Sequence, residues 1–281
     1  MPRDLADVFH YFLPETGTEA EPTQELLGGS PERRPARSDE IGVTRPVPAA
    51  VPPPLPILGV PIGSRDVLRA ALAWNLTIET ARLGASAVIL APAVDATSPL
   101  WPAPGAGPLG TELILSSATN LADLHHAAAE TAARRAARAR RGGIVFVRIP
   151  PDWLEEGDPE TNPFRWLLLL TSANRRDLDE AFAMAETVVA SNPVAEVGVT
   201  IHGVTTIDEA RRGFETLSRR VQRRLGLDLS SYGLLVDDLD VYRAIAAQRP
   251  IGLAHPQAPA ARALMDVARL LYEDARSRVL G

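Results

Sequence analysis

The stretch "LPILGVPIGSRDVLRAALAWNLTIETARLG", residues Leu55 to Gly84, decides the fold class. A short apolar run from Ile57 to Ile62 leads to a glycine, and a long helical pattern follows and closes at Gly84. A strand, a glycine-containing loop and a helix in this order are typical of a domain that binds the phosphates of a nucleotide, and the loop of such a domain carries a lysine. The 281-residue chain contains no lysine, so all 29 of its basic residues are arginine. The stretch therefore predicts the architecture of a phosphate-binding domain without its lysine.

Downstream of this stretch, strand-like and helical patterns alternate. The strand-like runs are residues 57–62, 87–90, 112–115, 144–149, 166–171, 197–201 and 233–236, and the helical patterns are residues 66–83, 121–141, 175–190, 206–225, 241–248 and 258–278. Runs such as "IVFV" and "WLLLL" are apolar throughout, which is typical of strands buried on both faces. The alternation predicts an α/β fold with a doubly wound, mostly parallel sheet of about seven strands and helices on both faces. Residues 92–110 interrupt it with a Pro/Gly-rich loop.

The sequence predicts three regions: a short amphipathic helix at 1–13, a linker at 14–54 and an α/β domain at 55–281. The linker is rich in Pro, Glu, Gly and Ser, and such a segment buries too little apolar surface to offset the entropy lost on ordering, so we expect disorder. The helix presents its apolar side chains at i, i+3, i+4 and i+7, namely Leu5, Val8, Phe9 and Phe12. An aromatic helix face on a flexible tether is a candidate ligand for a partner's groove. Docking on its own domain is the alternative.

Composition and charge exclude several function classes. A net charge of −6 and a pI near 5.5 argue against nucleic acid as the main partner. Arginine clusters at 134–141 and 219–224 are interpreted as solvated helix faces. The absence of cysteine excludes disulfides, thiol catalysis and zinc–cysteine sites. Without a signal peptide or an apolar run of about 18 residues, a cytoplasmic protein is expected, and the C-terminal helix is expected to pack on the domain rather than on a membrane.

The order of the elements resembles the MinD/ParA family of ATPases, most closely its FlhG branch, which regulates flagellar number and placement. The resemblance covers about Leu55 to Leu271 and is best in the C-terminal half, where turn residues and spacings agree with the family as well as the apolar pattern. The matching positions are Leu225-Gly226, Gly233, Asp237, Gln248-Arg249-Pro250 and the run from Pro256 to Leu264. The resemblance implies a P-loop fold, ATP and magnesium as cofactors, and an ATP-dependent dimer.

The N-terminal half departs from the family at the phosphate loop. The family's "SGKGGVGKT" falls on "IGSRDVLRA", Ile62 to Ala70, where Gly63 is retained. Ser64 replaces the lysine that reaches across the dimer, Arg69 replaces the Walker lysine, and Ala70 replaces the magnesium-binding threonine. Arg65 and Asp66 replace two glycines, although a phosphate loop needs glycines so that successive backbone N–H groups point inward. The loop is thus predicted to be degenerate.

The acidic motifs of the family are also absent. Ala91 and Ala93 stand where the family has an Asp-x-Asp motif, and Arg148 stands at the position of the Walker B aspartate. The asparagine that contacts adenine in the family aligns near His202-Gly203. Because magnesium requires oxygen ligands, we expect no metal and no catalytic residue.

These losses together predict a pseudo-ATPase: a non-catalytic scaffold or regulator without a cofactor, acting through protein contacts in a motility, polarity or secretion assembly. Its partners would be a protein bound by the N-terminal helix and a MinD/FlhG-like protein in a homodimer or heterodimer, with no nucleic acid and no membrane. One alternative is a divergent switch that still binds ATP and magnesium. The other is an inactive heterodimer partner of an active paralogue.

Three further polar groups have simpler interpretations. Adjacent residues on a helix point about 100° apart, so His125 and His126 are expected to be surface residues rather than a metal pair. Asp237–Asp240 is expected to contain a helix N-cap. Ser116–Asn120 is expected to form a turn, although it follows a strand and precedes a helix.

Overall fold

The computed structural model describes residues 52–93, 99–155 and 162–280. The predicted N-terminal helix with Leu5, Val8, Phe9 and Phe12 lies outside the described residues, and so does the predicted linker as far as residue 51. Its last residues, Pro52 to Pro54, are exposed and have no regular structure. Leu55 is buried, and its N–H donates to the carbonyl of Ala132 at 3.4 Å.

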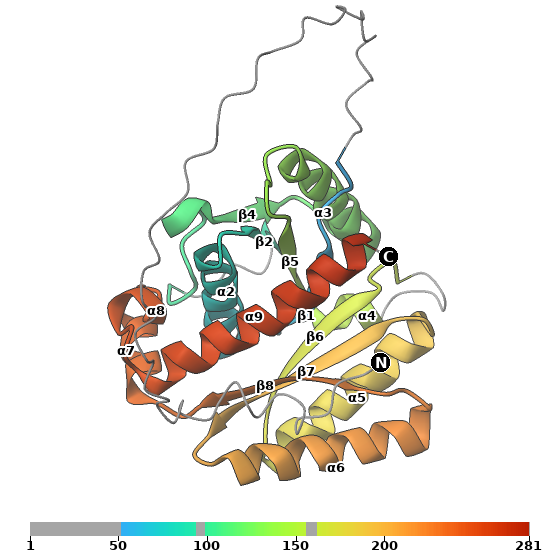
Figure 1. The fold of residues 1–281 in the computed structure, drawn as a ribbon. Coiled ribbons are helices and arrows are strands. Elements are labelled where there is room, and N and C mark those ends of the chain that lie inside the picture. The colour runs from blue at the N-terminus through green and yellow to red at the C-terminus, as the bar shows by residue number, and fades with distance from the viewer. Residues whose placement is uncertain (1–51, 94–98, 156–161, 281) are drawn as a thin grey trace, which may run out of the picture. The chain divides into compact units, whose positions relative to one another are not determined.

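The described residues form a doubly wound α/β domain around a sheet of eight strands, so the predicted fold class is confirmed (Figure 1). The strand order is β3-β4-β2-β5-β1-β6-β7-β8, and every pairing is parallel except that of β3 with β4. The strands are β1 (Ile57–Pro61), β2 (Ser86–Pro92), β3 (Gly105–Ala106), β4 (Glu112–Ser116), β5 (Gly143–Ile149), β6 (Trp166–Ser172), β7 (Glu196–Val204) and β8 (Ser230–Val236).

Helices cover both faces of the sheet. They are α2 (Val67–Arg82), α3 (Leu121–Ala136), α4 (Pro151–Glu155), α5 (Arg175–Ser191), α6 (Ile207–Leu225), α7 (Leu239–Ala246), α8 (Ile251–Ala254) and α9 (Pro259–Leu280). Helices α2 and α9 contact each other and the sheet, and α9 crosses beside α2 in Figure 1. Helices α5 and α6 likewise pack together against β6 and β7. The connection from β1 to β2 runs along the sheet in one direction, and the connections from β6 through β7 to β8 run in the opposite direction. Because such crossovers are right-handed, the pair α2 and α9 and the pair α5 and α6 cover opposite faces of the sheet.

The core follows from the apolar strands of the sequence. Every residue of β5 is buried, and β1 beside β5 and β6 beside β1 are buried almost throughout. The strand order changes direction at these central strands, because β2 and β4 are added next to β5, and β6, β7 and β8 are added next to β1. In an open parallel sheet, the loops after such strands form the crevice where ligands bind. The fold therefore places the loop after β1 and the end of β5 where a nucleotide site would lie.

The structure corrects some predicted boundaries. All seven predicted strands are present, but the Pro/Gly-rich loop at 92–110 also contains the short strand β3, and the short helices α4 and α8 were not predicted. Helix α3 ends at Ala136 rather than at Arg141. Residues 137–142 form the turn into β5, and β5 begins at a glycine because a Cβ on Gly143 would lie 1.9 Å from the Ser86 carbonyl oxygen. Gly142 makes the turn with φ of 75°.

Candidate functional site

The positions predicted to form a degenerate nucleotide site meet at the carboxyl ends of β1, β2 and β5. Gly63 and Ser64 follow β1, and Arg69 and Ala70 lie in the first turn of α2. Ala91 is buried on β2, and Arg148 is buried near the end of β5. Ala70, Ala91 and Arg148 line one small cavity. Ala93 follows β2 and is exposed. The alignment of these separate segments is thus consistent with the fold.

The loop after β1 uses its own backbone groups instead of presenting them to a ligand. The N–H of Asp66 donates to the carbonyl of Gly63 at 3.1 Å, and the N–H of Val67 donates to the carbonyl of Arg65 at 3.1 Å. None of residues 62–67 has a positive φ. Backbone nests that bind phosphate alternate right-handed and left-handed conformations so that successive N–H groups converge. The loop after β1 therefore does not have the backbone conformation of such a nest.

The N-terminus of α2 is capped by a carboxylate of the same chain. Asp66 is the N-cap residue, and its Oδ1 accepts from the Arg69 N–H at 2.9 Å. The first turn of a helix attracts anions because its N–H groups are unpaired and the helix dipole is positive there. The Asp66 carboxylate already supplies this negative charge. A triphosphate approaching the same turn would meet it and be repelled.

The Arg69 side chain forms ion pairs with two acidic residues of the same chain. Its Nη1 lies 2.6 Å from Glu180 Oε1 on α5 and 3.3 Å from Asp66 Oδ2. The side chain is only 12% exposed, so the ion pairs hold the guanidinium close to the protein instead of extending it from the loop. Two carboxylates around one guanidinium leave no excess positive charge at the position where the family has its Walker lysine. To bind a phosphate, Arg69 would have to leave both partners.

Arg148 places a buried cation at the end of β5. The residue is 2% exposed and is the largest fully buried side chain among the described residues. Its guanidinium carbon lies 3.6 Å from the centre of the Trp101 ring, close enough for a cation–π interaction. Its Nη2 donates to the carbonyl of Gly63 at 3.4 Å, so it also contacts the loop after β1. Trp101 belongs to the Pro/Gly-rich segment. Its stacking on Arg148 therefore holds this part of the segment against the end of β5.

The space that remains at the carboxyl ends of the strands is small. The cavity beside Arg148 and Trp101 is lined by Ile62, Trp74, Ile89 and other mostly apolar side chains, and it measures about 30 Å³. This is enough for a water molecule or two. Ligand pockets typically measure about 300–1,000 Å³. The cavity beside Arg148 and Trp101 is therefore far smaller than a typical ligand pocket.

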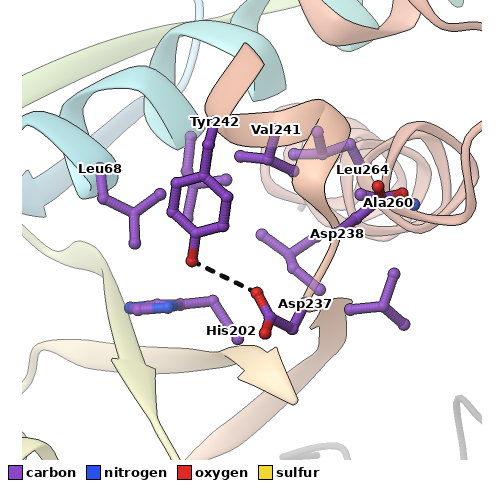
Figure 2. A pocket seen from close by; sticks show the side chains of 12 residues that line it. Leu68, His202, Asp237, Asp238, Val241, Tyr242, Ala260 and Leu264 are labelled. Carbon is purple, nitrogen blue, oxygen red and sulfur yellow. Dashed lines mark hydrogen bonds between the residues drawn. The ribbon is translucent and has the colours of Figure 1, made fainter. Parts of the chain in front are cut away.

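A second cavity lies at the ends of β7 and β8, beside His202, which was predicted to stand near the position of the family's adenine-contacting asparagine (Figure 2). It measures about 20 Å³ and is lined by His202 and by residues of α2, β8, α7 and α9. Tyr242 of α7 points its ring into this region, and its hydroxyl donates to Asp237 Oδ1 at 3.3 Å, which is a long hydrogen bond (Figure 2). The ring and its carboxylate partner thus occupy much of the space at the strand ends.

His202 is a buried, uncharged side chain. It is 7% exposed, and its Nε2 has no hydrogen-bond partner in the described part of the chain. The pKa of His202 is lowered to about 4, mainly by burial and secondly by the positive charge of Arg69, while Asp66 and Asp177 oppose the shift. The imidazole is therefore neutral at physiological pH. His202 therefore lines the cavity with a polar, uncharged side chain and does not act as a proton carrier.

The other candidate groups have structural roles. Asp238 caps α7, because its Oδ1 accepts from the Asp240 N–H at 2.9 Å. Asn120 caps α3, and the Ser116 hydroxyl accepts from the Ala118 N–H at 3.1 Å, as expected of a turn. His125 packs edge-on against Phe164 at 5.1 Å, and burial lowers its pKa. In the described ranges no three His, Cys, Asp or Glu side chains gather as a metal site would require.

Three residues of the site could not be found from the sequence. Glu180 lies 111 residues after its partner Arg69, and exposed helix glutamates are too common to single one out. Trp101 stands in a segment predicted as a loop, where no periodic pattern indicates what a side chain contacts. Tyr242 was part of a predicted helix, but its position beside Asp237 depends on how that helix follows β8.

Comparisons with known proteins support the fold. No protein-family model matches the sequence, and no curated protein sequence matches it. The MinD cell division protein of Aquifex aeolicus is similar in structure, with a TM-score of 0.54 and 15% identity over 77% of this chain and 96% of that chain. The MinC:MinD cell division protein complex of Aquifex aeolicus contains a similar chain, with a TM-score of 0.52 and 14% identity over 77% and 95%.

A third solved structure, a ParA family ATPase from Chlorobium tepidum TLS, has a TM-score of 0.50 and 14% identity over 78% of this chain and 99% of that chain. At these identities the similarity establishes the fold only. The chain thus has the α/β fold of MinD and ParA ATPases, as the sequence predicted. No helix in residues 52–93, 99–155 or 162–280 has the length and apolar character needed to cross a bilayer.

Proposed function

We propose that this protein is a pseudo-ATPase of the MinD/ParA type, closest to the FlhG branch, and that it acts as a scaffold or regulator through protein contacts. The observation that carries the proposal is the buried guanidinium of Arg148, which stacks on Trp101 and contacts the Gly63 carbonyl. A catalytic site of this fold needs oxygen ligands for magnesium near this strand end. A buried cation repels the metal and supplies no ligand.

The residues do not fit ATP and magnesium at the other subsites either. Asp66 supplies a negative charge at the helix N-terminus, and Glu180 and Asp66 neutralise Arg69. Ala70 and Ala91 have no side-chain oxygen to offer a metal. The loop after β1, the strand β2 and the strand β5 thus each disfavour the binding of ATP with magnesium. A divergent ATP-dependent switch would need all of these interactions to rearrange together.

The enzymatic part of the proposal is tested by phosphate release. We expect the purified chain with ATP and magnesium to release phosphate at the rate of a buffer blank. The ParA family ATPase from Chlorobium tepidum TLS, prepared in the same way, is a suitable positive reference. Magnesium-dependent phosphate release that rises in proportion to the concentration of this chain would contradict the proposal.

Protein partners are supported by the described surface. Large apolar side chains are exposed on α7 and α8, namely Leu239 at 70%, Tyr242 at 49% and Leu253 at 42%. A similar solved chain was determined in a complex of MinC with MinD. We propose that the present chain likewise works by binding other proteins, including a MinD/FlhG-like protein in a homodimer or heterodimer, and that it does so in the cytoplasm. The motility, polarity or secretion setting follows from the FlhG resemblance.

The N-terminal helix is proposed as a docking element. Replacing both Phe9 and Phe12 with alanine should abolish capture of a partner protein from a lysate while the melting temperature stays unchanged. Each large side chain buried in a partner groove contributes roughly 1.5–3 kcal/mol, so the double change would weaken a micromolar complex beyond detection. The matched control is Leu239→Ala with Leu253→Ala on α7 and α8. If the two phenylalanine changes leave capture intact and the control removes it, the docking surface lies on the folded domain.

A further inference from the structure

A small pocket, which we call the α7–α8 pocket, lies between helix α2, the connection from α7 to α8 and the Pro/Gly-rich segment. It measures about 180 Å³, and its walls are mostly alanine, proline and glycine, with Trp74, Leu100 and Ile245 as the larger apolar side chains. An apolar protein cavity of about 150 Å³ holds a benzene ring. The α7–α8 pocket therefore has room for one aromatic side chain.

The walls of the α7–α8 pocket are held in position by interactions within the domain. Gln248 Nε2 donates to the carbonyl of Pro99, which joins the α7–α8 connection to the Pro/Gly-rich segment. Gly107 lets this segment lie against Trp74, because a Cβ on Gly107 would lie 2.6 Å from a carbon of the Trp74 ring. Leu109 and Gln248 have φ of 58° and 52°, a left-handed conformation that is uncommon without glycine. The pocket is thus preformed, and little backbone ordering opposes binding there.

Arg249 gives the α7–α8 pocket a positive charge. It is exposed, and its side chain forms no hydrogen bond or ion pair within residues 52–93, 99–155 and 162–280. Its backbone N–H donates to the carbonyl of Ala244 at 2.9 Å, which fixes the position of the residue. Among the described lining residues there is no acidic side chain. The pocket therefore attracts a carboxylate, which arginine holds through two parallel hydrogen bonds.

The border of the α7–α8 pocket is apolar. Leu100 lines the pocket and is 45% exposed, and Leu109, which follows the lining residue Pro108, is 55% exposed. Protein interfaces concentrate binding energy in an anchor side chain that fills a pocket, with surrounding contacts that exclude water. Pockets for small molecules typically measure about 300–1,000 Å³. A one-ring pocket with exposed leucines beside it thus suits a protein segment better than a free metabolite.

We propose that the α7–α8 pocket binds a segment of a partner protein in which a phenylalanine is adjacent to an acidic residue. The phenyl ring fills the apolar interior beside Trp74, and the carboxylate pairs with Arg249. This inference rests on the proposal that the chain works by binding proteins, and it specifies the chemistry of one such partner. It places a docking site on the folded domain in addition to the N-terminal helix.

A second copy of this chain suits the α7–α8 pocket less well. Among the exposed large apolar residues of the described chain, Tyr242 is the one aromatic side chain. Its hydroxyl already donates to Asp237, and inserting the ring into the pocket of another copy would break that bond. A buried hydroxyl without a partner is unfavourable. A phenylalanine carries no such group.

The test uses the full chain and three capped dipeptides as probes: N-acetyl-Phe-Asp-amide, N-acetyl-Ala-Asp-amide and N-acetyl-Phe-Asn-amide. In an NMR titration, the Phe-Asp probe should cause saturable shifts of the Trp74 indole N–H and the Ile245 methyl groups. The methyl groups of Val194, at the amino ends of the strands, should not shift. Loss of the ring in the Ala-Asp probe should weaken binding at least about tenfold. Loss of the charge in the Phe-Asn probe should weaken it about threefold.

Variants of Arg249 test the role of its charge. Arg249→Gln should weaken binding of the Phe-Asp probe about threefold and leave that of the Phe-Asn probe unchanged. Arg249→Lys should retain part of the preference for the carboxylate. The matched control is Arg224→Gln on α6, where the arginine is also exposed and forms no ion pair in the described ranges. The control should bind all three probes as the parent does, and all variants should keep the parent's melting temperature.

Several results would overturn the proposal. These are no saturable shift at Trp74 and Ile245, equal affinity for the Phe-Asp and Ala-Asp probes, or equal weakening of both phenylalanine probes by Arg249→Gln. Shifts at Val194 instead would place the ring in a different groove. Shifts at Trp74 and Ile245 that depend on protein concentration without any probe would assign the pocket to a second copy. Each of these leaves the pseudo-ATPase proposal standing, because phosphate release and nucleotide binding are measured separately.

Discussion

Replacing Arg148 with aspartate should lower the free energy of unfolding by about 4 kcal/mol and should not create an ATPase. The change introduces the residue type that the resemblance to the MinD/ParA family leads us to expect at this strand end. In this protein, however, the new carboxylate would be buried against the Gly63 carbonyl oxygen, which now accepts a hydrogen bond from Arg148. It would also lose the stacking on Trp101. For a domain of this size the melting temperature should fall by roughly 8–16 °C.

The matched control is Arg148→Met, which keeps most of the side-chain volume without placing a charge in the site. Both variants lose the interactions of the guanidinium, but only Arg148→Asp places a negative charge in the buried site, so Arg148→Met should be clearly the more stable of the two. Chemical denaturation of both variants beside the parent measures the difference. An Arg148→Asp protein as stable as the parent, or one that hydrolyses ATP, would show that the guanidinium does not block a magnesium site.

The stability of the protein should also depend on pH through His202. Burial lowers the pKa of His202 in the folded state to about 4, from 6.5 in the absence of burial. The unfolded chain therefore takes up a proton at this residue at a higher pH than the folded chain does. Stability due to the neutral imidazole is fully present above pH 6.5 and is lost as the pH falls toward 4. The loss amounts to about 3 kcal/mol.

The variant His202→Asn isolates this contribution, because asparagine is polar but does not titrate. Unfolding free energies measured at pH 7 and pH 4 should differ by about 3 kcal/mol less in the variant than in the parent. Other groups that titrate in this range contribute equally to both proteins and cancel in the comparison. An identical pH dependence in the two proteins would mean that His202 is accessible to protons in the folded state.

The fold could be predicted because its determinants are local. The central strands contain apolar runs, such as IVFV in β5 and WLLLL in β6, and helix caps such as Asn174 and Thr206 stand directly before their helices. Where prediction failed, a contact between distant segments decided the outcome. Helix α3 stops at Ala136 because β5 must begin in register with Ser86 on β2, and nothing within the arginine-rich run itself indicates that constraint.

The candidate site was predictable in part. The motif comparison predicts that functional groups are missing at Ala70, Ala91 and Arg148, which stays a prediction, and it does not indicate what these positions contact. Glu180 neutralises Arg69 from another helix, and Trp101 covers Arg148 from a segment without a periodic pattern. Both contacts depend on tertiary packing, so the sequence predicted that chemistry was lost without predicting that the site is filled by the protein's own side chains.

The most direct test of the pseudo-ATPase proposal is equilibrium binding of ATP and ADP by isothermal titration calorimetry, with and without magnesium. If Asp66, Arg69, Arg148 and Trp101 occupy the site as the structure shows, neither nucleotide should produce binding heat above that of dilution, and magnesium should change nothing. A magnesium-dependent dissociation constant in the micromolar range, about −8 kcal/mol, would contradict the proposal and identify the protein as a nucleotide-dependent switch.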